Sequence, residues 1–333
     1  MSVKILRMKM DTKILVIGAN GQLGSVLTTE LRKKYTIENV IASDLKENDN
    51  HKGIFEVIDA TDRNRIQEVV ERYGITQIYH LAAILSAKGE ETPLTTWDIN
   101  MKTLFNVLEV SRNNNIDKVF FPSSIAVFGE GAPLDNTPDN AYLNPATVYG
   151  ISKAAGENWA QYYFLRYGLD VRSIRYPGVI GYQSLPGGGT TDYAVDIYHK
   201  AVLKEKFNCF LKEEATLPMI FMDDAIRATI ELMEAPKESI TVRTSYNIAG
   251  ISFSPGEVVD EIRKLYPDFK VNYKPDFRQE IASRWPKSID DASAVKDWRW
   301  QSKFNLKDIT EIMIQKLQER YKKGSQNKEI LMF

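Results

Sequence analysis

Short apolar runs alternate with longer amphipathic segments through the first half of the chain. Residues 12–17 form a run rich in β-branched side chains, which suits a strand buried on both faces of a parallel sheet. Similar runs predict strands at 39–43, 53–58, 75–81, 116–121 and 169–175. Helical sequence follows the first run to about residue 34 and recurs at 62–73, 92–114 and 147–167. This alternation predicts an α/β fold with a Rossmann-type, doubly wound parallel sheet.

Beyond Gly178 the elements become shorter. A glycine-rich loop at 186–192 precedes a predicted helix at 193–203. The remaining predicted elements are strands at 207–211 and 219–222 and helices at 223–234, 255–265 and 306–321, with 241–248 a further segment of the same part of the chain. We therefore expect residues 1–178 to form the doubly wound domain, with contributions from later segments, and 179–323 mainly a smaller C-terminal α/β lobe. The C-terminal tail, residues 324–333, is predicted to be disordered.

The composition excludes several classes of function. The 333 residues are 43% hydrophobic and 26% charged, and the formal net charge of −1 provides no electrostatic footprint for nucleic acid or an anionic membrane. No apolar run reaches signal-peptide or membrane-spanning length, so a cytoplasmic protein is expected. The single cysteine, Cys209, excludes an intramolecular disulfide and is expected to be a buried apolar residue. His51, His80 and His199 lack zinc-ligand spacing, so no metal is predicted.

A glycine-rich loop follows the first predicted strand. Its residues are Gly18, Asn20, Gly21, Gln22, Leu23 and Gly24. Glycines at a strand-to-helix junction let the backbone turn tightly and approach a pyrophosphate, which binds the free amides of the helix N-terminus. Asp44 follows the second strand, where a carboxylate accepts hydrogen bonds from the adenosine ribose and repels a 2′-phosphate. NAD is therefore favoured over NADP, although the nearby Lys46 weakens that preference and Asp44 has an alternative role as a turn residue.

Other candidate cofactor contacts follow the ends of later strands. Small residues near a strand end let a cofactor lie close to the backbone. The candidates are Asp59, Ala60, Leu81, Ala82, Ala83, Asn100, Ser123 and Tyr176. A turn or capping role is equally compatible with the position of Asp59.

A tyrosine and a lysine four residues apart carry the candidate chemistry. On the predicted helix at 147–167, Tyr149 and Lys153 share one face. An ammonium close to a phenol favours the phenolate and lowers the phenol pKa from its usual value near ~10, so the pair can take a proton from an alcohol. The alternative is a solvated helix face. Ser124, just past the end of a strand, is expected to point into the crevice above the sheet.

Together these motifs resemble the extended short-chain dehydrogenase/reductase family, which includes nucleotide-sugar epimerases and dehydratases. The matching segments, in order, are Gly18-x-x-Gly21-x-x-Gly24, Asp44, 80–83, Ser123-Ser124, Tyr149-x-x-x-Lys153 and 175–178. The resemblance covers essentially the whole chain. It implies that residues 1–178 bind NAD, that Tyr149 is the catalytic base, that Ser124 orients a substrate hydroxyl and that Lys153 also holds the nicotinamide ribose.

Within that family the C-terminal half resembles the short-chain L-threonine 3-dehydrogenases. The matching segments are 186–196, 217–219, 224–229, 273–279 and 285–291. The resemblance implies metal-free, NAD-dependent oxidation of the 3-hydroxyl of L-threonine to 2-amino-3-oxobutyrate, which decarboxylates to aminoacetone. Residues 178–182 depart from the Asn-x-Tyr-Gly-Pro-like stretch of sugar-nucleotide enzymes. An epimerase or dehydratase with tightly bound NAD, and a non-catalytic dinucleotide sensor, remain the alternatives.

The same resemblance suggests the substrate contacts. Ser86, Thr190 and Thr191 would bind the amino-acid carboxylate and ammonium, and Trp285 would close the pocket over the methyl group. Structural roles compete with these assignments, because Trp285 suits a core position and the threonines suit a helix cap. Loop 186–189 has the backbone freedom of a hinge, so we expect the small lobe to close over the substrate.

A homodimer is also expected. The helices predicted at 92–114 and 147–167 would pack against their symmetry mates as a four-helix bundle. The second helix carries more large side chains than one stripe facing a sheet requires. They include Trp159, Tyr162, Tyr163 and Phe164.

Overall fold

The computed structural model describes residues 12–48, 52–187 and 189–330, and a parallel sheet forms its centre. The strands lie in the order β10-β6-β5-β4-β1-β2-β3, and each pairs in parallel with its neighbours. Their bounds are β1 (Ile14–Ile17), β2 (Val40–Asp44), β3 (Phe55–Val57), β4 (Gln77–His80), β5 (Lys118–Ser124), β6 (Asp170–Tyr176) and β10 (Tyr246–Asn247). Strand order reverses between β1 and β4, so a crevice is expected at the carboxyl ends of these strands.

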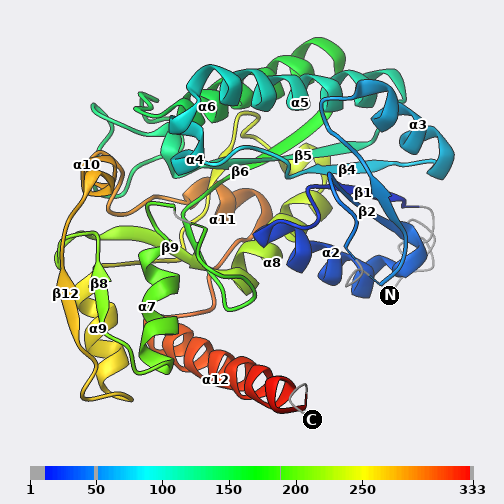
Figure 1. The fold of residues 1–333 in the computed structure, drawn as a ribbon. Helices are drawn as coiled ribbons and strands as arrows, with labels where there is room; N and C mark the ends of the chain where they lie inside the picture. Colours follow the sequence, from blue (N-terminus) through cyan, green and yellow to red (C-terminus); the bar gives the residue numbers. More distant parts are fainter. Residues whose placement is uncertain (1–11, 49–51, 188, 331–333) are drawn as a thin grey trace.

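Helices cover both faces of this sheet (Figure 1). One face carries α3 (Arg63–Tyr73), α5 (Pro93–Asn113) and α6 (Val148–Tyr167), and the other carries α2 (Gln22–Tyr35), α8 (Met222–Glu234) and α11 (Ala292–Trp298). Alternate residues of β1 enter two separate cores: Ile14 and Val16 pack towards α2, and Leu15 and Ile17 towards α3. A strand buried on both faces explains the uninterrupted apolar run in the sequence. The predicted doubly wound α/β fold is confirmed.

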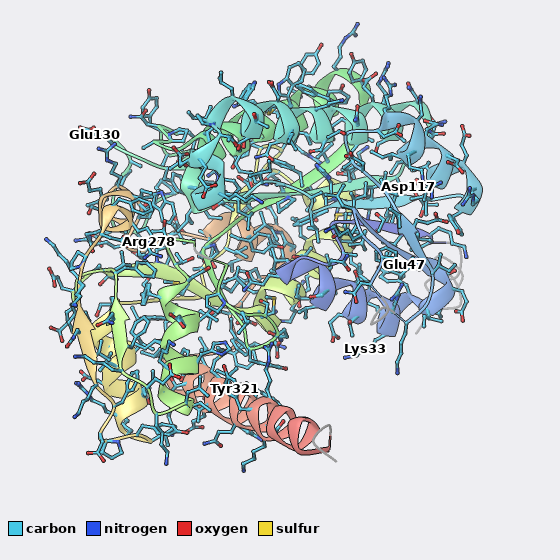
Figure 2. The ribbon with its side chains drawn as sticks, viewed as in Figure 1. Lys33, Glu47, Asp117, Glu130, Arg278 and Tyr321 are labelled. Carbon is cyan, nitrogen blue, oxygen red and sulfur yellow. The ribbon has the colours of Figure 1, made fainter. Side chains whose placement is uncertain are left out.

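A smaller lobe contains most of the second half of the chain. Its strands are β7 (Gly178–Ile180), β9 (Leu217–Phe221) and β11 (Ile251–Phe253) in one sheet and β8 (Phe207–Cys209) and β12 (Val271–Tyr273) in another. Its helices are α7 (Tyr193–Val202), α9 (Pro255–Arg263), α10 (Phe277–Ala282) and α12 (Leu306–Ile330). Figure 2 places Tyr321 on α12, and its hydroxyl lies 2.8 Å from Nδ1 of the buried His199 on α7. Cys209 is buried, as predicted.

Several short or terminal elements differ from the expectation. The pattern did not indicate α4 (Ser86–Glu91), α10 or α11, which have six or seven residues each and are too short for a helical period to be distinct. Helix α12 continues to Ile330, so residues 324–330, expected to be disordered, are helical. An existing helix elongates more easily than a new one nucleates, which allows α12 to continue through the poorer helix formers Gly324, Ser325 and Asn327. Residues 1–11, His51 and 331–333 lie outside the described residues.

The described ranges contain no helix that is long and apolar enough to cross a membrane. They also contain no group of three or more His, Cys, Asp or Glu side chains placed to hold a metal ion.

Candidate active site

Helix α6 begins at a defined point beside the end of β5. Its N-cap is Thr147, whose Oγ1 accepts a hydrogen bond of 3.1 Å from Gly150 N. In addition, Glu90 in α4 accepts a 2.8 Å hydrogen bond from Val148 N. A Cβ atom at Gly156 would overlap the Phe121 ring of β5, so glycine there allows the helix to lie directly against the strand. This start and close approach place Tyr149 and Lys153 at the carboxyl end of β5.

The three predicted catalytic residues meet at this strand end. Ser124 ends β5, is partly exposed and shares a side-chain hydrogen bond with Tyr149. Lys153 Nζ is buried, donates a 2.6 Å hydrogen bond to Pro122 O and lies 5.4 Å from the centroid of the Tyr149 ring. The folded chain therefore assembles the Ser-Tyr-Lys set from residues far apart in the sequence.

Burial has the largest effect on the pKa values of Tyr149 and Lys153. It raises the pKa of Tyr149 to about 12, an effect opposed by the hydrogen bond from Ser124. It lowers the pKa of Lys153 to about 7, and the carboxylate of Glu157 opposes that shift. The expected lowering of the Tyr149 pKa is thus wrong for the protein without cofactor, because burial disfavours the charged form of both groups. The positive charge of an oxidised nicotinamide would favour the phenolate.

The glycine loop has the geometry of an anion site. Gly18 has φ 92°, and a Cβ atom there would lie 2.7 Å from Ala82 N, so glycine is required both for the turn and for the contact with the strand end. The N-cap of α2 is Gly21, which makes no side-chain capping bond, and the first turn of α2 has no acidic residue. The first amides of α2, at Gln22 and Leu23, thus remain available, and they fit the pyrophosphate of a dinucleotide.

Asp44 lies beside this loop, as its position after β2 predicted. Its Oδ2 accepts a 2.9 Å hydrogen bond from Asn20 N, and its Oδ1 accepts a 2.7 Å bond from Leu45 N. A carboxylate can accept further hydrogen bonds at both oxygens, so these contacts fix its orientation and leave acceptor capacity for a ribose.

The remaining candidates along the strand ends differ in their exposure and in whether their side chains already form hydrogen bonds within the protein. Leu81 and Ala83 follow β4 and are partly exposed, while Ala60, after β3, is buried. Asp59 is exposed, and its carboxylate accepts a 2.8 Å hydrogen bond from Thr61 N, which is the turn role considered as its alternative. Asn100 on α5 holds the loop after β4, accepting from Ile84 N at 2.8 Å and donating to Ile84 O at 3.1 Å.

The side chains of Ser123 and Tyr176 are engaged within the protein. Ser123 Oγ donates a 2.5 Å hydrogen bond to the buried Glu157 on α6. The Tyr176 hydroxyl is bonded to Thr229 of α8, on the other face of the sheet. Their assignment to the cofactor therefore remains a prediction. The bond from Ser123 also identifies a site residue that the sequence analysis missed. This residue is Glu157, one helical turn beyond Lys153 on α6.

The proposed substrate residues come from three segments. A Cβ atom at Gly178 would lie 2.7 Å from Thr191 Cβ, so Thr191 packs against the chain just after β6. Thr190 is buried, and the N-cap of α7 is Asp192, so neither threonine provides the cap considered as an alternative. Trp285 is buried in the apolar cluster against which Tyr149 packs. Ser86 is the first residue of α4 and is partly buried.

Comparison with known proteins places the chain among enzymes of one family. The model of the NAD dependent epimerase/dehydratase family matches residues 14–249. An uncharacterized epimerase/dehydratase from Staphylococcus haemolyticus is 41% identical over 313 residues, which are 92% of this chain and 98% of the relative.

Two solved proteins that are similar over nearly their whole length are described as L-threonine dehydrogenases. A GalE-like L-threonine dehydrogenase from Cupriavidus necator in its holo form is 52% identical with a TM-score of 0.90, over 92% of this chain and 99% of that one. Its apo form gives a TM-score of 0.80 at 47% identity, over 91% and 99% of the two chains. A monomeric L-threonine 3-dehydrogenase from a metagenome, in its apo form, is 49% identical with a TM-score of 0.89, over 92% and 99%.

The family match and the described site agree on an NAD-type cofactor, because the loop, the carboxylate after β2 and the Ser-Tyr-Lys set occupy the places that a dinucleotide-dependent enzyme requires. The chain therefore belongs to the NAD dependent epimerase/dehydratase family of extended short-chain dehydrogenases/reductases.

Proposed function

We propose that this protein catalyses the NAD-dependent oxidation of L-threonine at its 3-hydroxyl to 2-amino-3-oxobutyrate, which decarboxylates to aminoacetone. The observation that carries this proposal is the Ser124, Tyr149 and Lys153 cluster beside a dinucleotide loop. It occurs in a chain whose solved neighbours are described as L-threonine dehydrogenases.

In the proposed reaction the protein removes a proton while the cofactor removes a hydride. Tyr149 Oη takes the proton of the substrate hydroxyl, and Ser124 donates a hydrogen bond that orients that hydroxyl. The carbon–hydrogen bond at the same carbon breaks, and a bound nicotinamide would accept the hydride. Lys153 stabilises the phenolate by its charge and would hold the nicotinamide ribose.

The cofactor would be held by two groups that the free protein already places together. The first amides of α2 would bind the pyrophosphate, and Asp44 would accept hydrogen bonds from the adenosine ribose. A carboxylate at that place repels a 2′-phosphate, which supports NAD over NADP.

The substrate would be recognised by short polar side chains and one aromatic ring. We assign the amino-acid carboxylate and ammonium to Ser86, Thr190 and Thr191, and the methyl group to Trp285. The packing of Thr191 against Gly178 and of Trp285 within the cluster that contacts Tyr149 supports this arrangement. If the KM for threonine is unchanged in both Thr191→Ala and Trp285→Ala, neither residue belongs to the pocket.

One assay separates this function from its two alternatives. The curated relatives are described as epimerase/dehydratase proteins, which favours a nucleotide-sugar epimerase or dehydratase as the second candidate. With threonine and NAD, a dehydrogenase accumulates NADH in step with substrate loss. An epimerase that regenerates its cofactor and a non-catalytic dinucleotide sensor accumulate none.

We also propose that the chain forms a homodimer through α5 and α6. Large side chains on the outer face of α6 are exposed in the single chain, among them Trp159 at 37%, Tyr162 at 46% and Leu165 at 73%. Burial of these groups against a second copy would brace the helix that holds Tyr149 and Lys153. The predicted cytoplasmic location remains a prediction.

A further inference from the structure

Three consecutive residues at the end of β5 are each bonded to one residue of α6. The pairs are Pro122 with Lys153, Ser123 with Glu157, and Ser124 with Tyr149. The three helix residues are spaced by four, so they lie on one face of α6. Two of the three pairs contain the proposed catalytic groups, whereas the Ser123–Glu157 pair takes no part in the chemistry.

Glu157 has the strongest set of bonds of the three helix residues. Its side chain is completely buried. Oε1 accepts hydrogen bonds from Ser123 Oγ at 2.5 Å and from Arg175 Nε at 2.9 Å, and Oε2 accepts from Arg175 Nη2 at 2.7 Å. Ser123 and Arg175 face each other in the register of β5 and β6. A single carboxylate therefore joins the catalytic helix to two neighbouring strands.

Further hydrogen bonds extend from this ion pair towards the segment that carries Trp285. Arg175 Nη1 donates to Asp139 O at 2.7 Å and to Asn247 Oδ1 at 3.4 Å. Asn247 Nδ2 in turn donates to Asp290 O at 3.1 Å. Asp290 lies a few residues beyond Trp285, so this buried network connects the catalytic helix to the segment that carries a proposed substrate contact.

We propose that Glu157 is a positioning residue for the reaction: its ion pair with Arg175 fixes α6 against the end of β5 and thereby sets the relative places of Ser124, Tyr149 and Lys153. This inference rests on the proposed function, in which those three residues act. A buried carboxylate is costly unless it is fully paired, so a purely structural helix-to-sheet contact would be served equally well by apolar side chains.

The charge of Glu157 has an electrostatic consequence at the site. The charged and titratable groups around Lys153 are Tyr149 and Glu157 on α6, His80 at the end of β4 and Arg175 in β6. Burial lowers the pKa of Lys153, and Glu157 holds it up. Loss of that negative charge should therefore lower the pKa of Lys153 further, so that the ammonium is lost at a lower pH.

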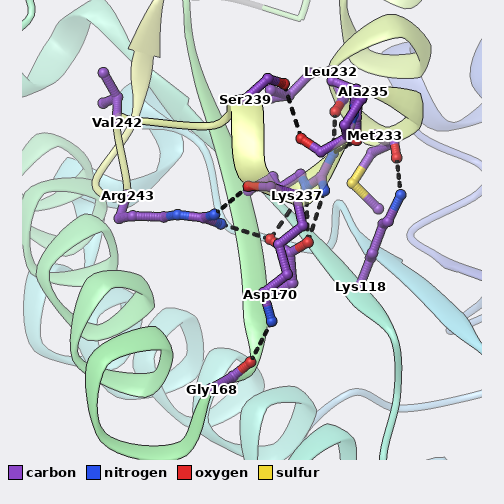
Figure 3. Close-up of polar contacts among 12 residues, drawn as sticks. Lys118, Gly168, Asp170, Leu232, Met233, Ala235, Lys237, Ser239, Val242 and Arg243 are labelled. Carbon is purple, nitrogen blue, oxygen red and sulfur yellow. Dashed lines mark hydrogen bonds and ion pairs between the residues drawn. The ribbon is translucent and has the colours of Figure 1, made fainter. Parts of the chain in front are cut away.

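A pair of the same chemistry at the other end of β6 provides a matched control. Arg172 and Asp170 are buried, and Arg172 Nη2 donates to Asp170 Oδ2 at 2.7 Å. Arg172 Nη1 also donates to Leu232 O at 2.6 Å and Ala235 O at 2.7 Å. Figure 3 shows this cluster at the start of the strand, where Arg243 reaches Asp170 as well. Since β6 is parallel to β5, the cluster lies at the edge of the sheet opposite to the proposed site.

The test compares Glu157→Gln with Asp170→Asn. Each change keeps the shape of the side chain and removes one buried charge, so both should lower the melting temperature. Only Glu157→Gln should reduce kcat with threonine, by at least about tenfold, because the catalytic groups lose their relative placement. Only this variant should also move the pH profile of kcat to lower pH, by about half to one unit. The conservative Glu157→Asp, which keeps the charge, should restore the pH profile while kcat stays reduced.

A measurement without cofactor or threonine separates this inference from the proposed function. NMR of isotope-labelled lysine side chains in the free protein reports the pKa of Lys153 directly, and Glu157→Gln should lower it whereas Asp170→Asn should not. If wild type oxidises no threonine but the Lys153 pKa moves as expected, the proposed function fails while the electrostatic coupling of Glu157 to Lys153 stands. If Glu157→Gln does not fold, the double variant Glu157→Gln with Arg175→Met, which removes both buried charges, replaces it. A folded variant with the Lys153 pKa of wild type, or with unchanged kcat and pH profile, would overturn the inference.

Discussion

Ser124, the last residue of β5, and Tyr149, in the first turn of α6, share a side-chain hydrogen bond across the carboxyl edge of the central sheet. This contact depends on where α6 begins, and Thr147 fixes that point as the N-cap. A helix starting one residue later would rotate Tyr149 by about 100° around the axis and away from the strand. The position of Tyr149, the proposed base, therefore depends on Thr147, a capping residue that takes no part in the proposed reaction.

The first prediction concerns that base. Tyr149→Phe should reduce kcat for threonine oxidation by about 100-fold or more, because the substrate proton then has no acceptor. Binding of NADH, followed by its fluorescence, should persist. Tyr198→Phe is the matched control, since it removes another buried phenolic hydroxyl, one that lies 2.9 Å from Thr310 Oγ1 in the small lobe. Turnover above about a tenth of wild type in Tyr149→Phe would rule out its role as base.

The second prediction concerns the choice of cofactor. Asp44→Asn removes the negative charge but keeps an oxygen that can accept the hydrogen bond from Asn20 N. The ratio of kcat/KM for NAD to that for NADP should fall by about tenfold, because the repulsion of a 2′-phosphate is lost. Asp59→Asn serves as the control: it removes an exposed carboxylate after the next strand and should leave the ratio unchanged. An unaltered ratio in Asp44→Asn would assign cofactor choice elsewhere.

The third prediction concerns assembly. Light scattering at micromolar concentration should give the mass of a dimer, and Leu165→Glu on α6 should give that of a monomer, because a buried unpaired charge opposes association. Leu203→Glu, at a site in the small lobe that is 41% exposed, should leave the dimer intact. One solved relative is described as monomeric, so a monomeric wild type is a definite alternative outcome. It would show that the exposed aromatic face of α6 is not covered by a second copy.

The sequence was sufficient to predict the doubly wound sheet because its strands are buried on both faces and read as uninterrupted apolar runs. The six- and seven-residue helices were missed, since so few residues do not complete a recognisable helical period. Strand β6 illustrates another limit: it contains Asp170, Arg172 and Arg175, and all of its residues are buried. Its charges are tolerated because each is paired: Arg172 with Asp170 of the same strand, Asp170 also with Arg243, and Arg175 with Glu157 of α6.

The candidate site, too, could be predicted from the sequence only in part. The spacing of Tyr149 and Lys153 predicted a shared helix face, which the structure contains. Spacing could not reveal that Lys153 is buried and Tyr149 partly buried, and this burial reverses the expected direction of the Tyr149 pKa. Glu157 was missed because a glutamate in a helix is ordinarily exposed. Its position one turn beyond Lys153 was visible, whereas its partner Arg175 comes from a different element.

The last prediction concerns closure of the small lobe over the substrate. Asp192 Oδ2 accepts hydrogen bonds from Gly187 N at 2.6 Å and Gly189 N at 2.9 Å, so the loop after β7 is held as a turn. Gly188 lies outside the described residues. These bonds give a physical basis to the alternative of a preformed pocket. The chain matches the holo form of the Cupriavidus necator enzyme with a TM-score of 0.90 and its apo form with one of 0.80; closure of the small lobe in this chain is a prediction.

Hydrogen exchange of residues 182–195 distinguishes the two possibilities. With NAD alone the loop amides should exchange faster than with NAD and a non-reacting threonine analogue, because closure would exclude water from the segment leading to Thr190 and Thr191. Asp192→Ala should release the turn, speed exchange in the NAD complex and raise the KM for threonine by about fivefold, since more ordering must then accompany binding. Its effect on the KM for NAD should be smaller, because the hydrogen bonds that this change removes lie within the loop itself. Equal protection in the two wild-type complexes would exclude a lid and leave a pocket that is formed before the substrate arrives.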